Sequence, residues 1–520
     1  MTAARGSTDR VVLPRWRAWR ISERGGELES LRPTTRTDQS ESVGTSSEDE
    51  LAKRLVAFER WSGIFEAADV VSTAIVLGLE TYPGVRKAAE SLVRAPLSVT
   101  RELADRILSG TSGMASLLDL EPESRLELDF AQSRTDDQLR VAELRNIVRR
   151  QPRNALRWTD LALAHTVLGN IDAAAKAMRT AISLGNGNRF ILRAAARFYV
   201  HRNDLEAAHN VLIADEDRLL SDPWLLAAEI AIADLAELPQ RYVNRGRLSL
   251  DRDFAPRHIS ELASALSTVE MNAGRMRRAR QLLRAALVDP TENSLAQAEW
   301  SAERGLDLVS PTQLRLPLSF EAQARHLSRV GEFGNAVTQA RLWQVDQPFA
   351  LDPALYTSYL ASTLIENYEA AIWACETGLR TNPGDLVLLN NLAFSQASLG
   401  QVDKAAETMA KLPLTVADVR KLATWTATRG LIAFRRGDAV LGRRLYQESI
   451  ASWQRQGGRK EAAKAATYWA REELLAGTDH IGEALAAVRE LGKNVTSDPE
   501  TDILRERLRR LAISMVHGAE

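Results

Sequence analysis

From about residue 141 to residue 491, small and apolar positions recur with the spacing of paired amphipathic helices. Gly169 interrupts the first clear pair, and a shift of 34 residues places Asn203 at the same break. Glu366 and Gly400 are separated by the same interval of 34 residues. This pattern predicts an all-α solenoid in which each unit is a helical hairpin that buries its apolar face against the next unit.

The units share small pairs in the first helix, a turn residue, an alanine in the second helix and, once, a closing proline: Leu161-Ala162, Ala195-Ala196 and Leu392-Ala393; Gly169, Gly274, Gly331 and Gly400; Ala174, Ala208, Ala279, Ala336, Ala371 and Ala405; and Asn382-Pro383. In these residues the units resemble the tetratricopeptide repeat family over about two thirds of the chain, although residues 221–258 and 294–316 fit the template poorly. The resemblance implies a solenoid whose first helices line a concave face, where a partner protein or peptide binds.

The rest of the chain follows other patterns. Residues 1–50 contain a long polar stretch, Thr34–Glu50, so a mostly disordered tail is expected there. Residues 51–140 show helical spacing with frequent breaks, which predicts an irregular helical region. Residues 492–520 predict a single capping helix that seals the end of the solenoid.

Composition and charge exclude several classes of protein. The 67 Lys and Arg residues balance 68 Asp and Glu residues, so a nucleic-acid partner is not expected. The one cysteine, Cys375, excludes an intrachain disulfide, and its position predicts a small buried apolar residue. No signal sequence or membrane span is recognised, which predicts a cytoplasmic protein.

No pattern indicates catalytic, cofactor-binding or metal-binding residues. The sequence contains neither a phosphate-binding glycine loop nor an HExxH motif. His201 and His209 lie eight residues apart, but the break at Asn203 puts them on different helices. We therefore expect no cofactor and no enzyme activity, with a small catalytic region in residues 51–140 as the remaining alternative.

The first helices supply the candidate partner-binding residues. Arginines four residues apart share one helix face, and guanidinium groups match carboxylates, so the predicted partner is a protein or an acidic or carboxylate-bearing peptide. The alternative is a solvated charged face. If the groove binds a partner, Arg193, Arg197, Arg325 and Arg329 are expected to matter for binding and not for folding. The candidates on the concave face are Arg193, Arg197, His201, Arg325, Arg329, Tyr356, Asn390, Phe394 and Arg435.

A separate candidate is the Arg/Trp segment from Leu13 to Arg20, which contains Trp16 and Trp19. It has two main interpretations: a short motif that docks on a partner, or a strand that packs back on its own chain. A nucleic-acid arm has less support, because an acidic run follows. The polar stretch behind the segment is long enough for a tether, which favours docking on a partner.

The sequence therefore predicts a non-enzymatic scaffold or adaptor that binds a partner in the groove of a solenoid. A regulatory or sensor subunit of a multi-protein system is the first alternative. An enzyme with a small catalytic N-terminal region and a repeat targeting arm is the second. The oligomeric state and the identity of the partner are not predicted.

Overall fold

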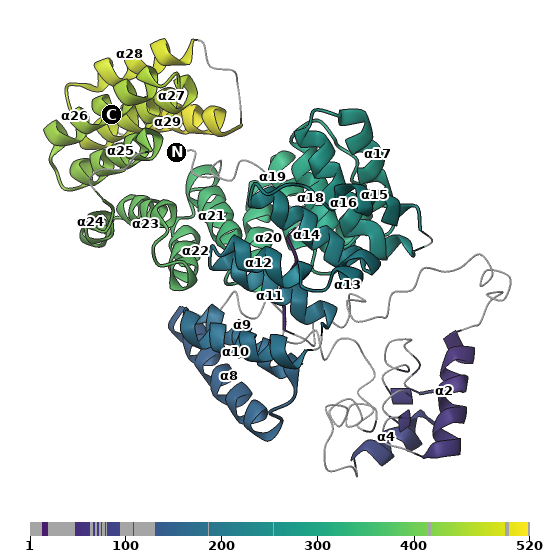
Figure 1. The fold of residues 1–520 in the computed structure, drawn as a ribbon. Helices are drawn as coiled ribbons and strands as arrows, with labels where there is room; N and C mark the ends of the chain where they lie inside the picture. The colour runs from purple at the N-terminus through teal and green to yellow at the C-terminus, as the bar shows by residue number, and fades with distance from the viewer. Residues whose placement is uncertain are drawn as a thin grey trace. The chain divides into compact units, whose positions relative to one another are not determined.

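The computed structural model describes residues 13–18, 47–62, 66–67, 70–71, 74, 79, 81–93, 108, 130–185, 187–252, 254–413, 418–493 and 499–517. The regular secondary structure of these residues is helical throughout (Figure 1). The chain divides into two compact units, the larger formed by residues 1–19, 126–251 and 255–520, and the smaller by residues 20–125 and 252–254.

The larger unit is a succession of short helices. Its first part contains α8 (Phe130–Arg150), α9 (Ala155–Val167), α10 (Ile171–Leu184), α11 (Arg189–His201), α12 (Leu205–Ile213), α13 (Glu216–Ser221), α14 (Pro223–Leu235), α15 (Val243–Leu250), α16 (Pro256–Asn272), α17 (Met276–Ala286), α18 (Glu292–Ala302) and the single-turn 3₁₀ helix η4 (Gln313–Arg315). Its second part contains α19 (Phe320–Arg329), α20 (Phe333–Asp346), α21 (Leu351–Tyr359), the π-helical turn η5 (Leu360–Leu364), α22 (Tyr368–Thr381), α23 (Leu386–Ser398), α24 (Val402–Ala410), α25 (Val419–Arg435), α26 (Ala439–Arg455), α27 (Arg459–Ala476), α28 (Ile481–Gly492) and α29 (Pro499–His517).

Consecutive helices pack as hairpins, and the turn inside most hairpins has one residue with positive φ. This left-handed conformation ends a helix and favours glycine. Its recurrence confirms the predicted tetratricopeptide-like solenoid. The turn residues are Gly169, Asn203, Glu237, Gly274, Gly331, Glu366, Gly400 and Gly437, with φ between 54° and 87°.

The two regions that fit the template poorly are nevertheless units of the array. In the first, α14 and α15 are separated by a turn at Glu237, where φ is 54° although the residue is not glycine. In the second, α18 is followed not by a full second helix but by η4, a single turn. The sequence template missed these units because one lacks the turn glycine and the other lacks the second helix.

Small side chains occupy the helix crossings of the array. Ala371 and Ala405 are fully buried, as are the equivalent alanines of the other units. Cys375 is also fully buried, and burial raises the pKa of its thiol to about 12. The prediction that Cys375 is a buried apolar residue is therefore confirmed, since so high a pKa keeps the thiol protonated and unreactive.

The array also contacts itself across a long stretch of sequence. Asp137 on α8 forms an ion pair with Arg380 on α22 at 3.1 Å, and both side chains are nearly buried. Close by, a β-carbon added at Gly169 would lie 2.5 Å from the backbone oxygen of Arg380. The helices α8 and α9 thus lie against α22, more than 200 residues later in the chain.

The C-terminal helix α29 does more than cover the last hairpin. It packs on α27 and reaches η5, where Arg507 donates to the carbonyl oxygens of Thr363 (2.8 Å) and Leu364. Glu500 accepts hydrogen bonds from the hydroxyl of Tyr359 at 2.9 Å and from Lys464. The helix α29 thus contacts the first helices of two separate hairpins, α21 with its extension η5 and α27.

The described part of the smaller unit contains α2 (Ser47–Trp61) and α4 (Val85–Val93). Leu51, Leu55 and Phe58 on α2 bury their side chains against an apolar cluster that includes Val85 and Leu92. Within the described residues of the whole chain, no group of His, Cys, Asp or Glu could hold a metal ion. No helix among them is long and apolar enough to cross a membrane.

Candidate functional site: the seat of an internal segment

The N-terminal segment Leu13–Ala18 runs as an extended chain over helices of its own array. Trp16 is 1% exposed, and the side-chain amide of Asn293 donates to the carbonyl oxygen of Leu13 at 2.7 Å. We call the side chains that hold this piece the segment site: Phe198, Glu292, Asn293, Glu321, Asp346 and Phe349.

The indole of Trp16 is held between two buried aromatic rings. Its ring lies 5.9 Å from that of Phe198 on α11 and 5.3 Å from that of Phe349, both in edge-to-face geometry. Such pairs contribute about 0.5–1.5 kcal/mol each beyond the area they bury. The indole N–H has no acceptor among the described residues, so the seat recognises the apolar surface of the ring.

Arg17 binds two carboxylates. Its Nε and Nη2 donate to the two oxygens of Asp346 at 2.6 and 2.8 Å, and its Nη1 donates to Glu292. This fork-to-fork pairing with Asp346 is the strongest geometry available to an arginine. Burial raises the pKa of Glu292, but the charge and hydrogen bond of Arg17, a backbone hydrogen bond and the charge of Arg15 together lower it to about 2.

Arg15 extends the charge pairing to the next helix. It donates to Glu321 on α19, a carboxylate that also accepts from Nε of Arg325 at 3.0 Å. The Glu321 side chain is only 4% exposed. The two arginines that flank Trp16 are therefore both neutralised by buried or nearly buried acids of the array.

Two carboxylates of the segment site, Glu292 and Asp346, depend on Arg17 for charge pairing. Among the described residues, no other cation lies within ion-pair distance of Glu292 or Asp346. A carboxylate that is buried without a partner costs several kcal/mol. The site therefore requires a cationic group at this position or access of water to both acids.

Two of the predicted residues contact Phe349, the ring that packs against Trp16. The guanidinium of Arg197 stacks 5.0 Å from the centre of the Phe349 ring, and His201 meets the same ring edge-on at 5.6 Å. Burial lowers the pKa of Arg197 to about 10. Burial, together with Arg197, lowers the pKa of His201 to about 4, so its imidazole is neutral at pH 7.

The other predicted arginines are already paired with acids of the same chain, so they do not form a row of unpaired cations. Arg193 is 2% exposed, which contradicts the expectation of an exposed face that folding does not need. Tyr356 contacts Arg325 through its ring, at 5.3 Å. The pairs are Arg193 with Glu261 (2.7 Å), Arg325 with Glu321 (3.0 Å), Arg329 with Asp307 (2.9 Å) and Glu299 (3.1 Å), and Arg435 with Glu472 (2.8 Å).

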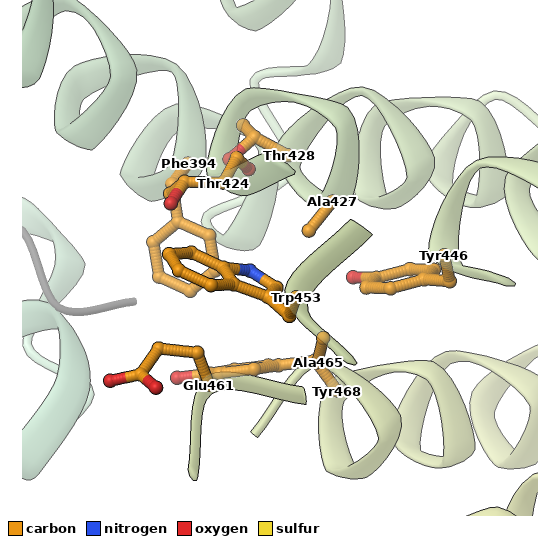
Figure 2. A pocket seen from close by; sticks show the side chains of 9 residues that line it. All are labelled: Phe394, Thr424, Ala427, Thr428, Tyr446, Trp453, Glu461, Ala465 and Tyr468. Carbon is orange, nitrogen blue, oxygen red and sulfur yellow. The ribbon is translucent and has the colours of Figure 1, made fainter. Parts of the chain in front are cut away.

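Phe394 and Asn390 belong to a second place on the array. Phe394 lines a cavity of about 20 Å³, and Asn390 accepts a hydrogen bond at 2.9 Å from Thr428, which lines the same cavity. This volume holds about one water molecule. The cavity is thus too small for a peptide side chain, and the segment site is the better candidate. Figure 2 shows the lining residues: Phe394, Thr424, Ala427, Thr428, Tyr446, Trp453, Glu461, Ala465 and Tyr468.

The structure bears on the two main interpretations of the Arg/Trp segment. Leu13–Ala18 packs on its own chain, as the second interpretation states. Trp19 and Arg20 lie outside the described residues. The acids and aromatic rings that receive the segment were not predicted, although the basic and aromatic residues of the tail were a signal that complementary groups exist.

Comparisons with known proteins add little to this geometry. No family model and no curated protein matches the chain. Among solved structures, a human IFIT1 dimer with PPP-AAAA is 16% identical over 69% of this chain and 90% of that chain, with a TM-score of 0.36. Yeast Tom70 is 12% identical over 96% of both chains, with a TM-score of 0.28. A structure of Naa15/Naa10 bound to HypK-THB is 13% identical over 91% of this chain and 92% of that chain, with a TM-score of 0.25.

The hairpins and their turns decide the fold. The chain is a tetratricopeptide-like helical solenoid. Likenesses at such low identity and TM-score carry no conclusion about function, so the segment site is interpreted from its own contacts.

Proposed function

We propose that this chain is a non-enzymatic scaffold that binds a partner protein by taking an extended segment of it into the segment site. The observation that carries the proposal is Leu13–Ala18 itself: a stretch of extended polypeptide is held there by one anchored ring, three charge pairs and a hydrogen bond from a side chain to its backbone. A surface that holds one extended segment has the features needed to hold another.

The contacts match what extended-peptide recognition requires. A buried aromatic anchor in the middle of a contact is the usual source of affinity, and flanking charges provide register and specificity. Trp16 is the anchor. The flanking residues Arg15 and Arg17 form ion pairs with acids on separate helices, α19 and α20.

The internal occupant also favours the second candidate function, a regulatory or sensor subunit. Because the segment belongs to the same chain, a partner that enters the site must displace it. Partner binding would then be coupled to release of the N-terminal region, which is the kind of two-state element on which regulation depends.

Selection from a random peptide library tests the proposal. The bait is the full chain carrying Trp16→Ala and Arg17→Ala, which weaken the internal segment. The counter-bait carries the same changes and also Phe349→Ala, which removes a wall of the aromatic seat. Peptides that bind the first bait and not the second would support the proposal, whereas a selection that yields no peptide dependent on Phe349 would contradict it.

A further inference from the structure

We infer that the partner segment has the pattern basic–aromatic–basic, and that Leu13–Ala18 is an exchangeable internal competitor for it. This inference rests on the proposed function and specifies its ligand. It reverses the charge expected from the sequence, since it assigns a cationic ligand to a face that was predicted to bind an acidic one.

The aromatic position is defined by shape. Phe198 and Phe349 are both fully buried, and their rings meet Trp16 at 78° and 60°. Since no acceptor receives the indole N–H among the described residues, a phenylalanine or tyrosine ring meets the same surface. The seat therefore selects an aromatic ring and is tolerant of its type.

The position after the ring is defined by charge. Asp346 and Glu292 converge on one guanidinium, and Arg17 is the one described cation that pairs with them. An acidic or neutral residue here would leave both acids unpaired, and an acidic residue would add repulsion. The two oxygens of Asp346 also match the planar fork of arginine better than a lysine ammonium.

The position before the ring is less demanding. Glu321 already has a partner in Arg325, at 3.0 Å, so Arg15 adds a second cation to a carboxylate that is paired without it. We therefore expect the arginine after the aromatic residue to contribute more to binding than the one before it.

Competition follows from covalent connection. The internal segment shares a chain with its site, so it competes at an effective concentration that is set by the connecting residues 19–129 and not by the concentration of the protein. A free peptide of the same sequence must therefore bind the wild-type chain much more weakly than a chain whose own segment is disabled.

Fluorescence anisotropy with a labelled peptide of residues 11–20 tests this inference on the full chain. We expect the Trp16→Ala, Arg17→Ala chain to bind the peptide at least tenfold more tightly than the wild-type chain. Adding Asp346→Arg to that chain should weaken binding at least tenfold, and a peptide carrying Arg17→Glu should recover part of the loss. Asp403→Arg is the matched control, because Asp403 is 95% exposed and should leave binding unchanged.

The inference is overturned if wild-type and disabled chains bind the peptide equally, or if Asp346→Arg and Asp403→Arg have the same effect. If the chain with Trp16→Ala and Arg17→Ala does not fold, a second experiment on a cleavable variant replaces it. A specific protease site is inserted between Gly25 and Gly26, and the cleaved protein is mixed with labelled peptide. Exchange of the cleaved fragment for the peptide supports the inference. Retention of the fragment until the protein unfolds would show that the segment is a permanent part of the fold and would overturn the inference.

The library selection separates the two failures. Peptides that depend on Phe349 but share an acidic consensus would leave the proposed function standing and refute the basic–aromatic–basic pattern. Absence of any peptide that depends on Phe349 would refute the proposed function itself.

Discussion

Two parts of the helical array each hold a segment from outside the run of hairpins, and they do so by different means. Between α11 and α20 the bound element is the extended segment Leu13–Ala18, held by one aromatic ring and by charge pairs. Between η5 and α27 it is a helix, α29, whose apolar residues Leu504 and Leu508 belong to the core cluster of the last hairpins.

This difference separates a ligand-like contact from a structural one. The extended segment contributes one large buried side chain, Trp16, and pairs with acids that its release would open to water, so we expect the surrounding hairpins to survive its release. Release of α29 would uncover Leu504 and Leu508 and break the Lys464–Glu500 pair, which is buried on both sides. We therefore expect the first contact to be exchangeable and the second to be permanent.

The largest effect is expected from α29. Leu504→Ala and Leu508→Ala should each lower the free energy of unfolding by about 2–5 kcal/mol, the usual cost of truncating a buried leucine. Urea unfolding followed by circular dichroism measures this loss. Ile513→Ala, at a residue 49% exposed on the same helix, is the control that should change little. Equal curves for all three variants would mean that α29 is not part of the core.

The contact between α9 and α22 can be tested by replacing two turn glycines, one at the contact and one away from it. Gly400→Ala should cost about 1–2 kcal/mol, since it forces alanine into a left-handed conformation with free space around it. Gly169→Ala imposes a similar strain and also drives its β-carbon to 2.5 Å from the backbone of Arg380. Denaturation midpoints should therefore fall further for Gly169→Ala. A larger loss for Gly400→Ala would contradict the contact between α9 and α22.

Replacing a buried alanine at a helix crossing by the larger leucine tests the packing within the hairpins. Ala371→Leu and Ala405→Leu should each cost about 1–3 kcal/mol, because both side chains are fully buried at helix crossings. Ala410→Leu on α24 is the matched control, since Ala410 is exposed. Thermal melts that show the same loss at residues 405 and 410 would place Ala405 on the outside of the array.

A smaller effect is expected from His201, whose imidazole lies against Phe349. Its pKa is lowered from 6.5 to about 4 by burial and by Arg197, so the unfolded chain binds a proton more readily than the folded one. Stability due to this group should be complete above pH 6.5 and decline as the pH falls towards 4. His201→Phe keeps the ring contact and removes the titration, so its melting temperature should depend less on pH in this window. Identical pH profiles would show that His201 is not shielded.

The sequence predicted the solenoid because its turn residues and small crossing residues are local signals. It missed the unit around Glu237, where the turn uses a residue that tolerates positive φ poorly, and it could not place α29 against residues 359–364, because that contact depends on superhelical geometry. The same limit applies to the segment site. Asp346 and Glu292 look like ordinary helix-end acids in the sequence, and only the fold brings them to Arg17.

The central claim is that the segment site holds Trp16 of its own chain. Fluorine NMR of the full chain labelled with 5-fluorotryptophan tests it directly, with Trp16→Phe used to assign the resonance. We predict that the Trp16 signal is displaced from that of free fluoroindole and shows no shift when H₂O is replaced by D₂O, because the side chain is 1% exposed. A Trp16 signal at the free position with a full solvent isotope shift would contradict the account.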